Sequence, residues 1–212
     1  MTGPDSGTRG GRRLPAAAAA VLLLAGLALI VQALRGHPGP PGPPAWAASP
    51  RPAGHPGPVL GRSEPTRIAL PSIGVRAAVT PLSPNPDGSA GTPPIDRPRI
   101  AGWHAPGPSP GEQGPAVILG HVDDRNGPAV FYDLGRLRPD DTVEVTRRDG
   151  RTAVFTVEAV EKVPKSRFPS QKVYGPTRHA TLRLVTCGGT FDKATHSYRD
   201  NIITYASKTS AH

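Results

Sequence analysis

Cysteine is almost absent from this chain, which has 212 residues and a single thiol, Cys187. One cysteine excludes a disulfide within the chain, and it excludes any zinc site built from several thiolates. Aromatic residues are scarce as well, at 5% of the sequence. Since no basic stripe interleaved with aromatic side chains occurs, the composition does not predict nucleic acid as a partner.

Acidic residues are scarce near the N-terminus, where residues 1–62 contain six arginines and one acid, Asp5. This stretch therefore carries +5 of the net charge of +9. The remaining residues hold 19 Lys and Arg against 15 Asp and Glu, so their charge is nearly balanced. Arg147, Arg148 and Arg151 flank Asp149-Gly150, and we expect them at an exposed hairpin tip.

Long apolar runs are rare too, and the chain has one, LPAAAAAVLLLAGLALIVQAL at residues 14–34. From Ala16 to Leu34 the only polar residue is Gln32. A helix of that length spans about 28 Å, close to the ~30 Å hydrocarbon core of a bilayer. Three arginines precede the run and one follows it closely, so the positive-inside rule predicts a cytoplasmic N-terminus. We therefore predict a cytoplasmic segment at 1–13 and a single-pass transmembrane signal-anchor at 14–34.

A cleaved secretory signal is the alternative for the same run. Its cleavage site would be Ala45-Trp46-Ala47, which begins ten residues beyond the apolar stretch. This separation favours an uncleaved anchor in the cell membrane. Both alternatives place the chain beyond residue 35 outside the cell.

Proline and glycine dominate residues 36–58, with nine prolines and five glycines. Such a composition buries too little apolar surface to offset the entropy lost on ordering. We therefore predict a semi-rigid extracellular spacer at residues 35–62 and a globular domain at residues 63–212.

The globular part consists of short β-branched runs separated by proline and glycine, with little helical periodicity. Asp149-Gly150 between two alternating runs predicts a β-hairpin, and residues 130–137 leave room for a helical turn or two. Many short strands without a long helix indicate an all-β fold, either a closed barrel or a sandwich. The expected strands are Thr66–Leu70, Val75–Thr80, Ile100–His104, Ala116–Gly120, Thr142–Thr146, Thr152–Glu161, Thr181–Thr186 and Asn201–Ala206.

The single cysteine follows an apolar run and precedes two glycines, in TLRLVTCGG at residues 181–189. We expect it where a strand stops and a loop begins. A free cysteine is commonly a small buried residue. Outside the cell, however, an exposed thiol is disfavoured unless it has a function, and the two glycines would let a substrate backbone approach the sulfur. We therefore interpret Cys187 as a candidate nucleophile.

Two further residues stand at similar strand ends. His121 follows the run AVILG, and a histidine there could act as general base toward a thiol or pair with the thiolate as imidazolium. Arg199 precedes the last strand, and antiparallel pairing of the last two strands would set it facing Cys187. A guanidinium there could hold a substrate carbonyl or its oxyanion; the alternative is a solvated arginine paired with Asp192 or Asp200. We expect the three side chains to meet at one mouth of the barrel.

The order of these residues resembles the sortases. LVTC has His121 sixty-six residues upstream and Arg199 twelve residues downstream. The family signature TLxTC is matched except at its first threonine, where Arg183 stands. TCGGTFD and YRDNIITYA are most similar to class F sortases of actinobacteria. The resemblance covers residues 64–207 and implies a membrane-anchored cysteine transpeptidase of Gram-positive bacteria with a closed eight-stranded β-barrel and short helical turns.

The resemblance also implies a role for each residue. Cys187 would attack the threonine carbonyl of an LPXTG-type sorting signal and form a thioacyl enzyme. His121 would protonate the departing glycine amine and then assist the incoming amine. Arg199 would bind the peptide and stabilise the oxyanion. Thr186 would contribute to substrate contact or to the oxyanion site, with packing as the alternative.

The implied partners are sorting-signal peptides and an amine from a peptidoglycan precursor, so that exported proteins become anchored to the cell wall. We expect a monomer and no cofactor. We also expect no metal, because Asp123 and Asp124 beside His121 offer too few oxygen ligands for calcium, and zinc would need further His or Cys. Two other functions stay open: a thiol hydrolase that releases its acyl group to water, and a non-catalytic, membrane-tethered β-barrel that binds wall or peptide ligands with Cys187 buried.

Overall fold

The computed structural model describes residues 39–52, 54–88 and 90–209. The cytoplasmic segment predicted at 1–13 and the anchor predicted at 14–34 lie outside these ranges, and both stay predictions. Within the described ranges, no helix is long and apolar enough to cross a membrane.

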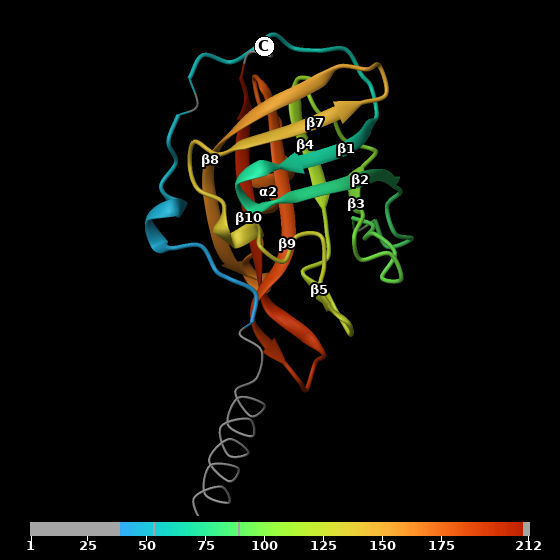
Figure 1. The fold of residues 1–212 in the computed structure, drawn as a ribbon, viewed down its shortest axis with the longest axis vertical. Coiled ribbons are helices and arrows are strands. Elements are labelled where there is room, and N and C mark those ends of the chain that lie inside the picture. The colour runs from blue at the N-terminus through green and yellow to red at the C-terminus, as the bar shows by residue number, and fades with distance from the viewer. Residues whose placement is uncertain (1–38, 53, 89, 210–212) are drawn as a thin grey trace, which may run out of the picture. The chain divides into compact units, whose positions relative to one another are not determined.

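Eight strands close into a barrel in the order β1-β2-β3-β4-β9-β10-β8-β7, and β7 pairs with β1 to complete it (Figure 1). This confirms the all-β class and the closed eight-stranded barrel. β2 with β3 and β4 with β9 pair in parallel, and the other neighbours are antiparallel. The strands are β1 (Pro65–Leu70), β2 (Val75–Leu82), β3 (Ala101–His104), β4 (Gly114–Leu119), β7 (Thr142–Arg147), β8 (Thr152–Pro164), β9 (Ala180–Asp192) and β10 (Ser197–Lys208).

The β7–β8 hairpin forms where the sequence predicts it. Gly150 in its turn has a φ of 81°, a left-handed conformation that glycine adopts without steric cost. Alternate residues of both strands are buried, and Val143 pairs with Phe155 at zero exposure. The alternation of apolar and polar residues thus sets which face of this hairpin packs inward.

Arg147 ends β7 and is not exposed, contrary to the expectation for the hairpin tip. Its side chain is 1% exposed and forms an ion pair with Asp149. The guanidinium also donates hydrogen bonds to the carbonyl oxygens of Gly61 and Pro110. A buried cation needs such partners, and they come from segments that local sequence does not reveal.

Short helical turns connect the strands. η3 (Leu134–Arg136) lies in the stretch 130–137 where a turn is expected. η4 (Lys165–Arg167) and α2 (Ser170–Tyr174) occupy the connection between β8 and β9 and are not predicted from the sequence. The remaining elements are η1 (Ala45–Ala48), η2 (Pro71–Ile73) and a two-stranded sheet of β5 (Asp123–Asp124) and β6 (Gly127–Pro128).

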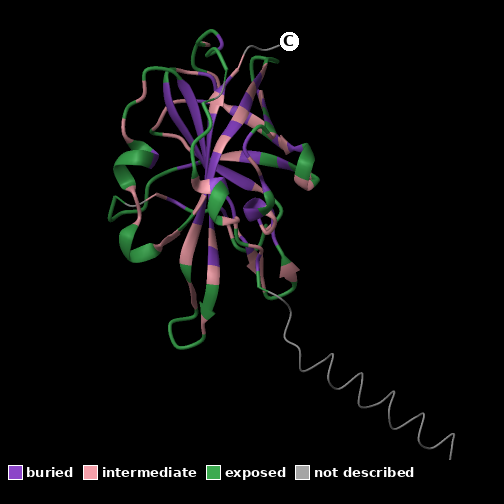
Figure 2. Ribbon diagram, turned by 90° about the vertical axis from the view of Figure 1, so that its left-hand side faces the viewer, coloured by how far each residue is buried: buried purple, intermediate pink, exposed green. Residues whose placement is uncertain are grey.

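Apolar side chains fill the barrel interior, and the strands that enclose them are drawn mainly in purple in Figure 2. Trp103, Phe131 and Phe155 are the bulkiest, each at most 1% exposed. The indole N–H of Trp103 donates to the carbonyl of Pro108, so this large ring is buried without an unsatisfied donor. The packed interior holds the strands that carry the candidate site in fixed relative positions.

A second apolar cluster covers the outside of the barrel on β4, β8, β9 and β10, because successive residues of a strand point to opposite faces. Val173 of α2 belongs to it, and Phe168 just before α2 packs against it. The connection between β8 and β9 therefore shields this face from water. We call this the outer cluster, and its buried members are Val117, Ala159, Val173, Val185, Ile203 and Tyr205.

The described part of the proline-rich segment packs along the barrel. Ala47 of η1 is fully buried in the core cluster. The N–H of Arg51 donates to the carbonyl of Glu158, and the N–H of Gly57 donates to that of Lys208. The prediction was that this composition buries too little apolar surface to be ordered. It did not take into account that the barrel supplies apolar surface against which the segment packs. The extracellular position of residues 35–62 and their role as a spacer stay predictions.

β9 and β10 are longer than predicted. A loop is expected at residues 188–198, but β9 continues to Asp192 and β10 begins at Ser197, as the hairpin projecting at the bottom of Figure 1. The carboxylate of Asp192 accepts hydrogen bonds from the N–H groups of Ala194 and Thr195 and so closes the turn. The two glycines after Cys187 indicated a loop, but ladder pairing tolerates them here.

Candidate active site

Cys187 lies within β9, five residues before the strand ends, instead of at the strand end. Leu184 of the same strand belongs to the barrel interior, whereas Val185 belongs to the outer cluster. Strand alternation therefore places Cys187 on the outer face with Val185, two residues beyond the last pair of the β4–β9 ladder. The residue is partly exposed. A ligand on the outer face can reach such a thiol, whereas the non-catalytic alternative requires it to be buried.

The offset of the β4–β9 ladder equals the sequence separation of His121 and Cys187. The two strands pair in parallel with an offset of 66 residues, which sets Leu119 opposite Val185. The N–H of Gly120 donates to the carbonyl of Val185 at 3.1 Å, so the ladder continues past the end of β4. Carried two residues beyond Leu119, the same offset sets His121 opposite Cys187 on the outer face. The sequence separation that resembles the sortases is thus a strand register.

The ring of His121 is partly buried and anchored by main-chain groups. Its Nε2 lies 2.7 Å from the carbonyl oxygen of Pro93. A carbonyl only accepts, so Nε2 carries a hydrogen, and in the neutral form of the ring the lone pair is at Nδ1. The N–H of Phe131 donates to the carbonyl of His121 at 3.0 Å, which holds the main chain. A ring in this state can take a proton from a thiol.

Arg199 lies where the β9–β10 register shifts, between Tyr198 and Asp200. Its Nη2 lies 3.2 Å from Oδ2 of Asp192, and its side chain is 67% exposed. The structure thus shows the solvated ion pair that the sequence leaves open as the alternative. Such an exposed pair contributes little to stability, so the guanidinium can exchange its partner at low cost.

Asn201, not Arg199, stands opposite Cys187 in the β9–β10 ladder. The prediction that Arg199 faces Cys187 assumed that β9 ends at the cysteine. The longer strands and the bulge move Arg199 toward the hairpin turn and bring a carboxamide beside the sulfur. Asn201 was not predicted from the sequence, because it can be identified only once the register between β9 and β10 is known.

Thr186 points into the barrel. It is 4% exposed, and its Oγ1 is buried without a hydrogen-bond partner among the described residues. Since it precedes Cys187 in a regular strand, its side chain lies on the opposite face of the sheet. This placement fits the packing alternative, and it leaves no path from the hydroxyl to a ligand at Cys187.

Tyr198 and Asp123 form a hydrogen-bonded pair that was not predicted from the sequence. The hydroxyl of Tyr198 donates to Oδ2 of Asp123, and its ring packs edge-on against Phe191 with centroids 5.2 Å apart. Burial, followed by the nearby carboxylate of Asp123, raises the pKa of Tyr198, so the hydroxyl stays protonated at physiological pH. The bond joins the hairpin that carries Cys187 to the loop that carries His121.

His104 ends β3 near the outer cluster. Its ring packs edge-on against Tyr174 of α2, with centroids 5.6 Å apart. Burial lowers the pKa of His104, which keeps the ring neutral near pH 7. Its Nδ1 is buried without a partner among the described residues. Tyr174 is 38% exposed, so its ring offers apolar surface of the kind that accepts apolar side chains of a peptide.

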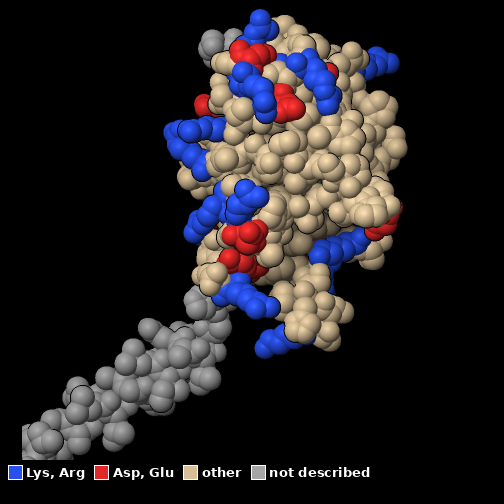
Figure 3. All heavy atoms as spheres, turned by 90° about the vertical axis from the view of Figure 1, so that its right-hand side faces the viewer, with Lys and Arg blue, Asp and Glu red and all other residues tan. Residues whose placement is uncertain are grey.

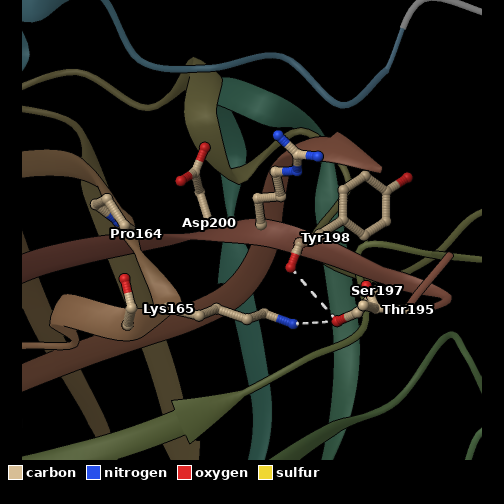
Figure 4. A pocket seen from close by; sticks show the side chains of 8 residues that line it. Pro164, Lys165, Thr195, Ser197, Tyr198 and Asp200 are labelled. Atoms are coloured by element: carbon tan, nitrogen blue, oxygen red, sulfur yellow. Dashed lines mark hydrogen bonds between the residues drawn. The ribbon is translucent and has the colours of Figure 1, made fainter. Parts of the chain in front are cut away.

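An open cavity of about 510 Å³ lies between η4 and the start of β10 (Figure 4). Within it Nζ of Lys165 lies 2.8 Å from Oγ of Ser197. Arg199 and Asp200 also line the cavity, whereas Cys187 does not. The guanidinium therefore borders open space rather than packed protein.

Charge and metal-ligating groups place limits on other functions. On the face drawn in Figure 3, basic side chains lie beside acidic ones near both ends and uncharged atoms fill the middle, so this face has no continuous basic stripe. Within the described ranges, no three His, Cys, Asp or Glu side chains gather to hold a metal ion. Asp123, considered above as a metal ligand, instead accepts the hydrogen bond from Tyr198.

An accessible thiol and a nearby imidazole are the pair that cysteine acyl-transfer sites use, and here the thiol lies on a strand of a closed eight-stranded barrel. The model of the sortase domain matches residues 68–209, and the chain belongs to the sortase family. Members of this family are cysteine transpeptidases that act on sorting signals.

Solved sortases share the fold at low sequence identity. Sortase A from Corynebacterium diphtheriae is 20% identical with a TM-score of 0.54, over 72% of this chain and 64% of that one, which is less than two thirds of its length. Sortase C-1 from Actinomyces oris is 17% identical with a TM-score of 0.54, over 68% of this chain and 73% of that one. Sortase C-1 from Streptococcus pneumoniae is 18% identical with a TM-score of 0.55, over 69% of this chain and 67% of that one. No curated protein matches the chain.

Proposed function

We propose that this sortase cleaves an LPXTG-type sorting signal through a thioacyl intermediate on Cys187 and transfers the acyl group to an amine, anchoring exported proteins to the cell wall. The family membership supports the class of reaction. The single observation that supports the residue assignment is the β4–β9 offset of 66 residues, which is also the sequence separation of His121 and Cys187.

The proposed chemistry uses His121 as the proton carrier. Nδ1 of His121 takes the thiol proton, and the sulfur of Cys187 attacks the threonine carbonyl carbon, forming a C–S bond and an oxyanion. Collapse of this intermediate breaks the C–N bond to glycine, and His121 returns the proton to the leaving amine. An incoming amine then attacks the thioester and gives its proton to His121. As the C–S bond breaks, His121 passes this proton to the sulfur and restores the thiol.

The sorting signal binds on the outer face in this proposal. Tyr174 and the partly buried side chains that pack against the outer cluster accept the apolar residues of the signal; the latter are Leu119, Val163 and Phe168. Arg199 exchanges Asp192 for the peptide and stabilises the oxyanion, which its exposure permits. Thr186 contributes by packing inside the barrel, because its side chain lies on the other face.

The cellular setting of the proposal rests on sequence. TCGGTFD and YRDNIITYA favour the class F group, and residues 14–34 anchor a monomer in the cell membrane with its N-terminus in the cytoplasm. The catalytic domain, residues 63–212, then acts outside the cell, where a peptidoglycan precursor supplies the amine. No cofactor or metal takes part.

The test incubates the full-length protein with an LPXTG peptide and triglycine and identifies products by mass spectrometry. A product carrying triglycine supports the transpeptidase, and Cys187→Ala should yield none. Cleaved peptide without transfer supports the thiol hydrolase instead. An inactive wild-type protein whose Cys187 also resists iodoacetamide would favour the non-catalytic binding module.

A further inference from the structure

Asn201 is the residue of β10 that lies directly across from Cys187. The β9–β10 ladder runs without a register shift from this pair to Thr181 and Ser207. Strand alternation therefore puts the side chains of Asn201 and Cys187 on the same face, with Cβ atoms typically about 5 Å apart. No group of another strand comes between them, because the two strands are hydrogen-bonded neighbours.

The carboxamide of Asn201 has no structural partner. It is partly exposed, and it makes no hydrogen bond to any residue in the described ranges. On its other side the ladder sets it opposite Val163 of β8, and Ile203 follows it on the same face. A polar group with two free N–H donors, on an otherwise apolar surface beside a thiol, is suited to a ligand carbonyl.

The guanidinium of Arg199 is placed differently. It is bound to Asp192 and lies beyond the bulge, toward the hairpin turn. In the structure as it stands, Asn201 is therefore the side-chain donor in register with the sulfur, and Arg199 must leave its carboxylate before it can help.

We infer that Asn201 is a catalytic residue whose Nδ2–H donates a hydrogen bond to the oxyanion formed when Cys187 is acylated. This inference deepens the proposed function and rests on it for the identity of the acyl donor. The oxygen gains negative charge as the C–S bond forms, so a donor already aimed at it stabilises the transition state more than the ground state. A carboxamide is one of the side-chain donors that supply such stabilisation, and removal of one donor typically lowers the rate by about 100-fold or more.

The experiment compares two reagents on the full-length protein, in order to distinguish stabilisation of the oxyanion from the intrinsic reactivity of the thiol. Acylation of Cys187 by p-nitrophenyl acetate passes through an oxyanion, whereas alkylation by iodoacetamide does not. For Asn201→Ala we expect acylation to slow by about 100-fold, with alkylation within about two-fold of wild type. Acylation within about two-fold of wild type would overturn the inference, and so would an equal slowing of both reactions.

Asn201→Asp is the matched variant, because it keeps the shape of the side chain and removes both donors. It should also acylate slowly, and it supplies the test if Asn201→Ala does not fold. With the LPXTG peptide, the loss in Asn201→Ala should appear in kcat and not in KM; a loss confined to KM would overturn the transition-state role. The ester does not depend on the sorting signal. A wild-type protein that fails on LPXTG but shows the ester effect would therefore refute the proposed substrate and leave the role of Asn201 standing.

Discussion

Tyr198 donates a hydrogen bond to Asp123, and so connects the start of β10 with the loop that leaves β4 at His121. Tyr198 is also close enough to Cys187 for the two to interact electrostatically. The thiol and the imidazole lie on different segments, and this bond holds the two segments together near both. Its loss should therefore affect the alignment of the reacting groups more than the stability of the barrel.

Tyr198→Phe removes the hydroxyl and leaves the ring against Phe191. We expect transfer activity to fall by about 10-fold, because small displacements of catalytic groups are costly, and unfolding free energy to fall by only about 1 kcal/mol. Turnover assays and urea unfolding measure the two effects. Thr66→Val removes a hydroxyl that donates to the carbonyl of Thr146 between β1 and β7, so it is the control and should keep its activity. Asp123→Asn combined with Tyr198→Phe should be no worse than Tyr198→Phe alone; additive losses would argue against a shared role.

Arg199→Lys should lower kcat/KM by about 10-fold, because a planar fork of donors becomes a single ammonium. Asp192→Asn is the counterpart, since it releases Arg199 from its ion pair while keeping the hydrogen-bonding shape of the turn. We expect Asp192→Asn to retain transfer activity. Steady-state kinetics with the LPXTG peptide measure both, and wild-type turnover by Arg199→Lys would remove the proposed role of the guanidinium.

Gly189→Ala should destabilise the hairpin behind Cys187. Gly189 has a φ of 75°, and an added Cβ would lie 2.0 Å from Oδ2 of Asp200. Gly74→Ala is the matched control, because Gly74 has a φ of 67° with nothing near its Cβ. The control should lose about 1 kcal/mol of unfolding free energy from backbone strain alone, and Gly189→Ala at least ~1 kcal/mol more. Equal losses in urea unfolding would mean that Asp200 moves away freely.

His104 should make stability depend on pH. Burial lowers its pKa in the folded state below the ordinary value of 6.5, so below pH 6.5 the unfolded chain binds the proton more readily. Unfolding free energy should therefore fall as the pH drops from 6.5 toward the folded-state pKa, and should be unaffected by this group above pH 7. His104→Gln should remove that part of the decline, whereas His179→Gln, at an exposed position, should not. Urea unfolding from pH 5 to pH 8 gives the comparison, and identical curves for wild type and His104→Gln would refute it.

Local pattern was sufficient for much of the fold. The eight β-branched runs become the eight barrel strands, and Asp149-Gly150 forms its hairpin, because alternation and turn chemistry act over a few residues. The two glycines after Cys187 led to a wrong prediction, because their effect on the backbone is also local. They indicate a loop locally, but pairing with β10 extends the strand across them.

The sequence by itself determined that a lone thiol follows an apolar strand, with a histidine 66 residues before it at the end of another. Only the tertiary structure decided that this separation is a strand register and that Asn201, rather than Arg199, faces the sulfur. It also decided that Arg147 and Ala47 are buried. Register, bulges and burial depend on contacts between segments far apart along the chain, and residue type at a single position does not encode which distant segment will pack against it.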